Sequence, residues 1–196
     1  MSTEAEKTVT NISIRSAYDS VEEIIGKKAR DIIFRKVGLS HVLESPPDYT
    51  WDKNYTNEEQ LNVYIETVEP IGPVGAQGVL RQIGYKNAES SVLKFGILDH
   101  LKDLPPDERI LQSFEFFKIA INKGRVVTDC GNLPKFDVFD CLMCSGIESR
   151  KPYCSQYAGA LLFFADWVFG KGIYIVKETK CMAMGDDTCL FEMEMR

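Results

Sequence analysis

Long apolar runs are missing from this chain of 196 residues. A membrane-spanning helix needs about 18 or more consecutive apolar residues, whereas the longest apolar stretch here is AGALLFFA at residues 158–165. The opening stretch MSTEAEKTVTN is polar and lacks the apolar core of a secretory signal. We therefore expect a cytoplasmic protein without a membrane span, in a compartment where thiols stay reduced.

An excess of positive charge is also missing. The chain carries 23 Lys and Arg residues against 29 Asp and Glu residues, for a formal net charge of −6. Nucleic-acid binding depends on clustered cations that contact phosphates, so we expect no direct nucleic-acid partner. The basic stretch at residues 26–36 is typical of the solvated face of an amphipathic helix.

Catalytic signatures are scarce. The two histidines, His41 and His100, are isolated in the sequence, and neither has a neighbouring partner for acid–base chemistry. Gly72, Gly75 and Gly78 are spaced three apart, which differs from the G-x-G-x-x-G of dinucleotide sites. These absences favour a non-catalytic role.

Cysteine, by contrast, is concentrated. All six cysteines fall between residues 130 and 189: Cys130, Cys141, Cys144, Cys154, Cys181 and Cys189. In a reducing compartment this clustering indicates metal or redox chemistry more readily than disulfides. The plainer alternative is that the thiols are small buried hydrophobic groups.

The hydrophobic pattern changes along the chain. Residues 1–16 are expected to form a flexible N-terminal segment, and residues 17–196 a single domain. Helical spacing at residues 18–37 and 105–124 predicts helices in the first half. Shorter helices are expected at residues 76–83 and 90–101.

The second half predicts strand–strand–helix–strand–strand. The strands are expected at residues 125–130, 135–142, 172–181 and 188–195, with a nearly all-apolar helix at 153–170. Segregated elements of this kind predict an α+β domain, with a helical N-terminal half packed on an antiparallel sheet.

The last hairpin carries candidate metal ligands. Folding it brings Glu178, Cys181 and Cys189 to one point near its mouth. Thiolate and carboxylate both bind zinc, and a structural site needs four ligands. Cys154, at the start of the apolar helix, is the best candidate for the fourth, because the helix dipole favours a thiolate there. Zinc would then clamp the helix to the hairpin.

A competing arrangement uses the C-x-x-C pair Cys141 and Cys144. Together with Cys181 and Cys189 this pair makes a chemically sensible all-cysteine zinc site. The same pair can also form a redox couple or a second, softer metal site. The residues alone leave these alternatives open.

Two motifs resemble a known family. C-x2-C-S-G-x7-C at residues 141–154 and V-x-E-x2-C-x-A-x-G-D-x2-C-x-F at residues 176–191 are similar to the 4-vinyl reductase domain. That family is related to phenol-sensor domains and to the fold of nitric-oxide-sensing and transport-particle domains. The resemblance implies a dimeric α+β domain with zinc on Cys154, Glu178, Cys181 and Cys189. It also implies a small hydrophobic ligand beside the zinc.

The function expected from these features is a zinc-stabilised binding or sensor domain for a hydrophobic or tetrapyrrole-like ligand. Aromatic side chains of the apolar helix and the next strand are candidate pocket residues, although each can simply fill the core: Phe163, Phe164, Trp167 and Tyr174. Two alternatives remain. One is a reductase or accessory protein acting on a tetrapyrrole vinyl group, and the other is a thiol redox sensor that uses Cys141 and Cys144.

Overall fold

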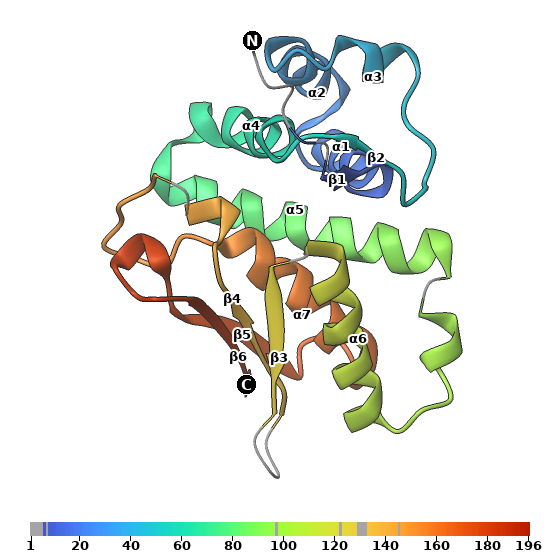
Figure 1. Cartoon of the computed structure of the whole chain (residues 1–196), viewed down its shortest axis with the longest axis vertical. Coiled ribbons are helices and arrows are strands. Elements are labelled where there is room, and N and C mark those ends of the chain that lie inside the picture. Colours follow the sequence, from blue (N-terminus) through green and yellow to red (C-terminus); the bar gives the residue numbers. More distant parts are fainter. Residues whose placement is uncertain (1–5, 7, 97, 122, 129–132, 145) are drawn as a thin grey trace.

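The computed structural model describes residue 6 and residues 8–96, 98–121, 123–128, 133–144 and 146–196. Its N-terminal half is helical, and an antiparallel sheet lies in the C-terminal half (Figure 1). The long helix α5 (Gly72–Phe95) runs between the two halves. The α+β class expected from the sequence is confirmed.

Helices dominate the first two thirds of the chain. Around the two-stranded pair β1 (Val9–Thr10) and β2 (Lys53–Tyr55) lie α1 (Asn11–Ile25), α2 (Lys27–Lys36), α3 (Ser40–Glu44) and α4 (Asn57–Val68). The chain continues through the 3-10 turn η1 (Glu69–Ile71), α5, η2 (Asp99–Leu101) and α6 (Pro106–Ile121). Among the described residues, no helix combines the length and apolarity needed to cross a bilayer.

The N-terminal helices begin earlier than expected and are interrupted. Residues 9–16, expected to belong to a flexible segment, instead lie in β1 and α1. Thr10 caps α1 through a 3.3 Å hydrogen bond from the Ser13 N–H, and Ile14 is fully buried. The single helix expected at residues 18–37 is two helices, because Gly26 breaks it with φ of +87°.

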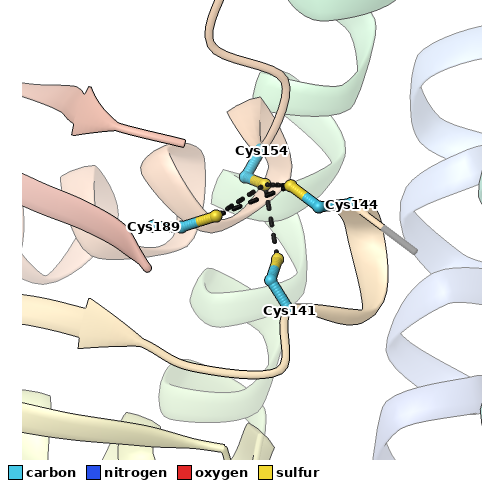
Figure 2. Close-up of side chains that lie close together, drawn as sticks. All are labelled: Cys141, Cys144, Cys154 and Cys189. Atoms are coloured by element: carbon cyan, nitrogen blue, oxygen red, sulfur yellow. Dashed lines mark hydrogen bonds between the residues drawn. The ribbon is translucent and has the colours of Figure 1, made fainter. Parts of the chain in front are cut away.

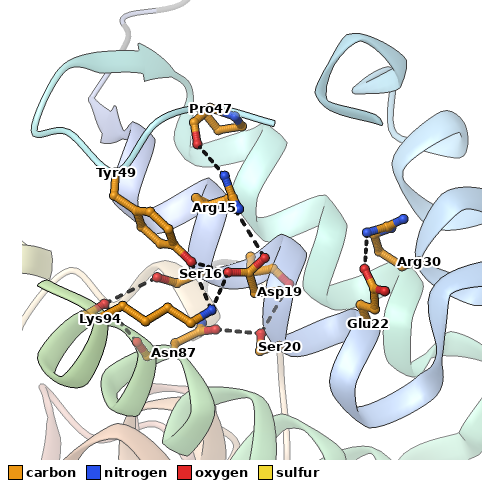
Figure 3. A network of polar contacts seen from close by, with 12 residues as sticks. Arg15, Ser16, Asp19, Ser20, Glu22, Arg30, Pro47, Tyr49, Asn87 and Lys94 are labelled. Carbon is orange, nitrogen blue, oxygen red and sulfur yellow. Dashed lines mark hydrogen bonds and ion pairs between the residues drawn. The ribbon is translucent and has the colours of Figure 1, made fainter. Parts of the chain in front are cut away.

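A polar network joins α1 to α5 (Figure 3). Asp19 accepts hydrogen bonds from Arg15 (3.2 Å), Lys94 (2.8 Å) and Tyr49. Burial opposes ionisation of this carboxylate, but the hydrogen bonds from Lys94 and Tyr49 outweigh it and lower the pKa of Asp19. The network therefore fixes α1 over α5 through an ionised side chain.

The two helices expected at residues 76–83 and 90–101 form one element, α5, followed by η2. The glycines that suggested a turn are accommodated within the first turns of α5. The helix ends at Gly96, which adopts a left-handed conformation with φ of +59°.

The C-terminal half contains the expected strand–strand–helix–strand–strand order. The strands are β3 (Gly124–Val127), β4 (Lys135–Val138), β5 (Tyr174–Lys180) and β6 (Cys189–Met195), and α7 (Ser155–Phe169) separates the two pairs. All pair antiparallel in the order β3-β4-β6-β5. Two 3-10 turns, η3 (Leu142–Cys144) and η4 (Met182–Met184), follow β4 and β5.

Helix α7 is apolar on nearly every side because it packs against α5, α6 and β5. Its crossing with α5 is unusually close. A β-carbon at Gly84 would lie 1.8 Å from the carbonyl oxygen of Gln156, and one at Gly159 would lie 1.9 Å from that of Arg81. Only glycine therefore lets the two backbones meet, and this contact positions the N-terminus of α7.

Candidate metal centre and ligand cavity

Five buried thiols meet where the sheet joins α7. They come from the end of β4 and η3, the residue before α7, and the two ends of the β5–β6 hairpin: Cys141, Cys144, Cys154, Cys181 and Cys189. None of them forms a disulfide. Figure 2 shows four of these side chains pointing toward one another from three separate segments. The sixth cysteine, Cys130, lies outside the described residues.

The sulfur atoms lie at metal-site distances. Cys154 Sγ is 3.4 Å from Cys141 Sγ, 3.0 Å from Cys144 Sγ and 3.7 Å from Cys189 Sγ. Cys144 Sγ is 3.5 Å from Cys189 Sγ and 3.6 Å from Cys181 Sγ. Zinc–sulfur bonds of about 2.3 Å place the sulfurs of a tetrahedral site about 3.8 Å apart. The cluster therefore has the size of a site for a single ion.

Two four-donor groups can be drawn in this cluster. One contains Cys141, Cys144, Cys154 and Cys189, and the other contains Cys154, Glu178, Cys181 and Cys189. Within each group the donor atoms lie within 4.8 Å of one another. Both groups include Cys154 and Cys189, so these two thiols are the centre of the cluster.

The Glu178 carboxyl is the one oxygen donor of these two groups. Its Oε2 accepts a 2.8 Å hydrogen bond from the Cys154 N–H, whereas its buried Oε1 has no hydrogen-bond partner. Burial raises the pKa of Glu178. A buried carboxyl oxygen without a partner, next to several thiols, fits a site that a cation completes.

The protonation pattern of the thiols points the same way. Hydrogen bonds from Cys141, Cys154 and Cys189 lower the pKa of Cys144. The neighbouring thiols in turn raise the pKa values of Cys154 and Cys189. One proton thus leaves readily, while further thiolates at this spacing need a compensating positive charge, which a divalent cation supplies.

The stretch M-A-M-G-D-D between Cys181 and Cys189 shapes the hairpin mouth. Asp186 accepts a 2.8 Å hydrogen bond from the Cys181 N–H, and Cys189 Sγ accepts one of 3.3 Å from the Met182 N–H. Gly185 ends η4 with φ of +98°, a conformation that side chains rarely tolerate. These contacts turn both thiols inward.

The donors expected from the sequence, Cys154, Glu178, Cys181 and Cys189, do meet at one point. Cys141 and Cys144, which the sequence left between a redox pair and a second metal site, join the same cluster. Spacing alone could not show that both motifs converge, because their meeting depends on how β4 and α7 are placed.

A cavity of about 430 Å³ adjoins the cluster. It lies between α1, α4 and α5 on one side and α6, η3 and α7 on the other. Leu142 and Met143, which separate Cys141 from Cys144, form part of its wall, as do Gln156 and Tyr157 just after Cys154. A second, largely apolar cavity of about 260 Å³ shares Met143 and Tyr64 with the first.

The larger cavity combines an apolar wall with a few polar groups. Gln156 is nearly fully buried, and its Oε1 has no hydrogen-bond partner. The Asn87 amide lies 3.0 Å from the Tyr64 hydroxyl, and burial raises the pKa of Tyr64 to about 12, so this hydroxyl stays protonated. Cavities of this size and polarity suit small organic ligands.

The lining differs from the aromatic set expected from the sequence. Phe164 lines the larger cavity, but Phe163, Trp167 and Tyr174 line neither cavity. Phe163 packs edge-on against Tyr85, Trp167 lies under the Arg109 guanidinium, and Tyr174 packs on Phe169. Helix α7 turns one face to the cavity and the others to its neighbours, which composition alone does not reveal.

Sequence reasoning missed Gln156, although a signal for it exists. It is a polar residue in the apolar helix, two positions after Cys154. Side chains at Gln156, Ala160 and Phe164 follow i, i+4, i+8 spacing and line one cavity. A buried amide on that face indicates a binding group.

Residues 134–195 match the family model of the 4-vinyl reductase (4VR) domain. This confirms the resemblance expected from the two cysteine motifs over that part of the chain. The uncharacterized proteins MJ1642 and MJ0745 of Methanocaldococcus jannaschii are 37% identical over 73 residues and 32% identical over 81 residues. These matches cover 37% and 41% of this chain, and 45% and 44% of those proteins. The chain therefore spans less than half the length of these curated relatives.

Solved structures share the fold over a longer stretch. An H-NOX protein from S. oneidensis in the Fe(II)NO ligation state superposes with a TM-score of 0.67, at 14% identity, over 96% of this chain and 99% of that chain. The phenol-responsive sensory domain of the transcription activator PoxR, solved with phenol, gives a TM-score of 0.56 at 15% identity, over 72% and 75%. The chain thus has the fold of ligand-binding sensor domains.

Proposed function

We propose that this chain is a sensor domain that binds a small, mainly apolar molecule carrying a hydroxyl group, and that a structural zinc ion stabilises it. The ligand would occupy the 430 Å³ cavity. Zinc would be held by Cys154, Glu178, Cys181 and Cys189, whose donor atoms lie within 4.8 Å of one another. We assign no catalytic step to the chain.

The observation that carries the ligand proposal is the buried Gln156 amide. Its Oε1 lacks a hydrogen-bond partner in a cavity whose other walls are largely aromatic and aliphatic. Leaving a buried acceptor unpaired costs about 1–3 kcal/mol. A ligand hydroxyl that donates to this oxygen would remove the cost, while its apolar body contacts Phe164 and Phe117. A phenol has both features.

The fold comparison supports a ligand of this class. The PoxR sensory domain is described as phenol-responsive and was solved with phenol, and the present chain shares its fold. The H-NOX proteins superpose as well but carry iron. Among the described residues that line our cavity, none is a histidine or a cysteine, so its wall favours a hydroxylated ligand over a haem held by either side chain.

The zinc proposal rests on the fit of the donor set. Three thiols and an unsatisfied buried carboxyl oxygen are ligands that zinc accepts, and together they complete a four-coordinate site. The ion would link the start of α7 to both ends of the β5–β6 hairpin. A closed site leaves no position for a reactive water, so its role is structural.

Thermal unfolding with matched ligands tests the binding function. Phenol should raise the melting temperature of the zinc-loaded chain more than toluene, which has a similar shape but no hydroxyl. The Gln156→Leu variant should lose the difference between the two, because the acceptor is gone. A hydrogen bond of about 0.5–1.5 kcal/mol corresponds to roughly a 2- to 13-fold difference in affinity.

Three outcomes would count against this proposal. Equal stabilisation by phenol and toluene in the unsubstituted chain removes the role of the amide. Stabilisation by a tetrapyrrole alone would favour the tetrapyrrole ligand considered above. Consumption of NAD(P)H with a vinyl porphyrin would favour the reductase alternative. Homodimerisation also remains a prediction, which native mass spectrometry of the zinc-loaded chain checks.

A further inference from the structure

The metal cluster has more donors than one ion needs. A closed zinc site uses four ligands, whereas six groups converge here: Cys141, Cys144, Cys154, Glu178, Cys181 and Cys189. We propose that the centre holds one ion in either of two alternative ligand sets that share Cys154 and Cys189. This inference rests on the zinc site proposed above and adds a second coordination state to it.

We call the two states by their donors. The mixed set completes the shared pair with Glu178 and Cys181, and the thiolate set completes it with Cys141 and Cys144. In the thiolate set, the described Sγ–Sγ distances are 3.4, 3.0, 3.5 and 3.7 Å. These lie close to the edge of about 3.8 Å for a tetrahedral zinc–thiolate site, so this set needs only small adjustments to bind an ion.

The position of Cys144 indicates alternation rather than two ions at once. Two ions bridged by the same pair of thiolates would hold their outer thiolates about 5 Å apart or more, given bonds of about 2.3 Å. Cys144 Sγ and Cys181 Sγ, one from each set, are only 3.6 Å apart. The two sets therefore overlap too closely to be filled together, and one ion at a time fits the geometry.

The choice of set reaches the ligand cavity through η3. In the thiolate set the ion would fix both ends of the Cys141–Cys144 turn, whose Leu142 and Met143 side chains line the cavity. In the mixed set that turn has no bond to the ion, and its wall is free to adjust to a ligand. A molecule that prefers one wall position must then shift the ion toward the corresponding set by the same free energy.

Metal analysis of paired variants of the full chain tests the two sets. Glu178→Gln with Cys181→Ser removes the mixed set, and Cys141→Ser with Cys144→Ser removes the thiolate set. Each pair should retain about one zinc per chain. With Co²⁺ in place of zinc, the sulfur-to-cobalt absorption should correspond to four thiolates in the first pair and three in the second. Cys154→Ser should weaken zinc binding at least tenfold.

The outcomes separate this inference from the zinc site itself. Loss of the ion from either double variant, with the unsubstituted chain still binding one, means that only one set exists and overturns the inference. Two ions per unsubstituted chain would overturn it as well, because both sets would then be filled. Absence of zinc from the unsubstituted chain would refute the proposed zinc site, while phenol binding would remain a separate measurement.

A measurement on the unsubstituted chain covers the case in which a variant fails to fold. Loaded with ¹¹³Cd²⁺, the chain should give cadmium resonances for both four-thiolate and three-thiolate environments, or one exchange-averaged resonance that moves when phenol is added. A single resonance at a three-thiolate position that phenol leaves unchanged would sink the proposal.

Discussion

The close crossing of α5 and α7 makes Gly159→Ala a demanding test of this structure. The added methyl group would lie 1.9 Å from the Arg81 carbonyl oxygen, 2.8 Å from its carbonyl carbon and 3.0 Å from the Tyr85 nitrogen. All three are backbone atoms of α5, so no side chain can rotate out of the way. The two helices must separate by about 1 Å or more to restore ordinary contact.

The cost follows from packing and helix propensity. Forcing extra volume into a tightly packed core costs about 1–3 kcal/mol, and this backbone-limited contact belongs at the upper end. Alanine in place of glycine recovers about 1 kcal/mol of helix propensity. The net effect is a destabilisation of about 2 kcal/mol, which lowers the melting temperature by roughly 4–8 °C in a chain of this size.

Urea unfolding of the zinc-loaded chain measures this effect, and Gly78→Ala is the matched control. Gly78 also lies within α5, but a β-carbon there meets nothing within 4 Å, so its substitution should stabilise by about 1 kcal/mol. The two variants should move the midpoint in opposite directions. If Gly159→Ala is as stable as the Gly78→Ala control, the close approach of α5 and α7 described above is wrong.

Three further predictions concern the site and its supports. Cys189→Ser removes a thiol common to both ligand sets, so metal analysis should find zinc lost and calorimetry a lower melting temperature; a variant that keeps its zinc would contradict this. Phe164→Leu changes the cavity wall whereas Trp167→Leu does not; titration calorimetry should show weaker phenol binding only for the first, and equal effects would argue against this cavity. Asp19→Asn should cost about 1 kcal/mol at neutral pH. Because the folded-state pKa of Asp19 is lowered, its contribution is present above the ordinary value of about 3.9 and disappears as the pH falls through the lowered one. Unfolding at both pH values checks this, and a pH-independent difference would refute it.

The α+β class was readable from the sequence because hydrophobic periodicity changes along the chain. Helical spacing marks α6, and alternation marks β5 and β6, so local pattern and final structure agree there. Local pattern failed where a backbone conformation decided the outcome. Gly26 breaks a helix at positive φ, whereas the glycines at the start of α5 do not, and spacing alone does not separate these cases.

The donor chemistry of the metal centre was likewise set by the sequence. Thiols and a carboxylate at Glu178, Cys181 and Cys189 lie on one hairpin, and short-range geometry brings them together. Their number in space was not. Cys141 and Cys144 reach the same point only because β4 pairs with β6, with Val138 opposite Cys189, and carries the following turn to the start of α7.

The ligand cavity depended most on tertiary structure. An apolar helix such as α7 can turn any face inward, so its sequence suggested Phe163, Trp167 and Tyr174 as readily as Phe164. Two glycines at the α5–α7 crossing fix which face meets which neighbour. Residue types therefore determined what this protein can bind with, and the packing of helices against the sheet decided which of those groups share a cavity or an ion.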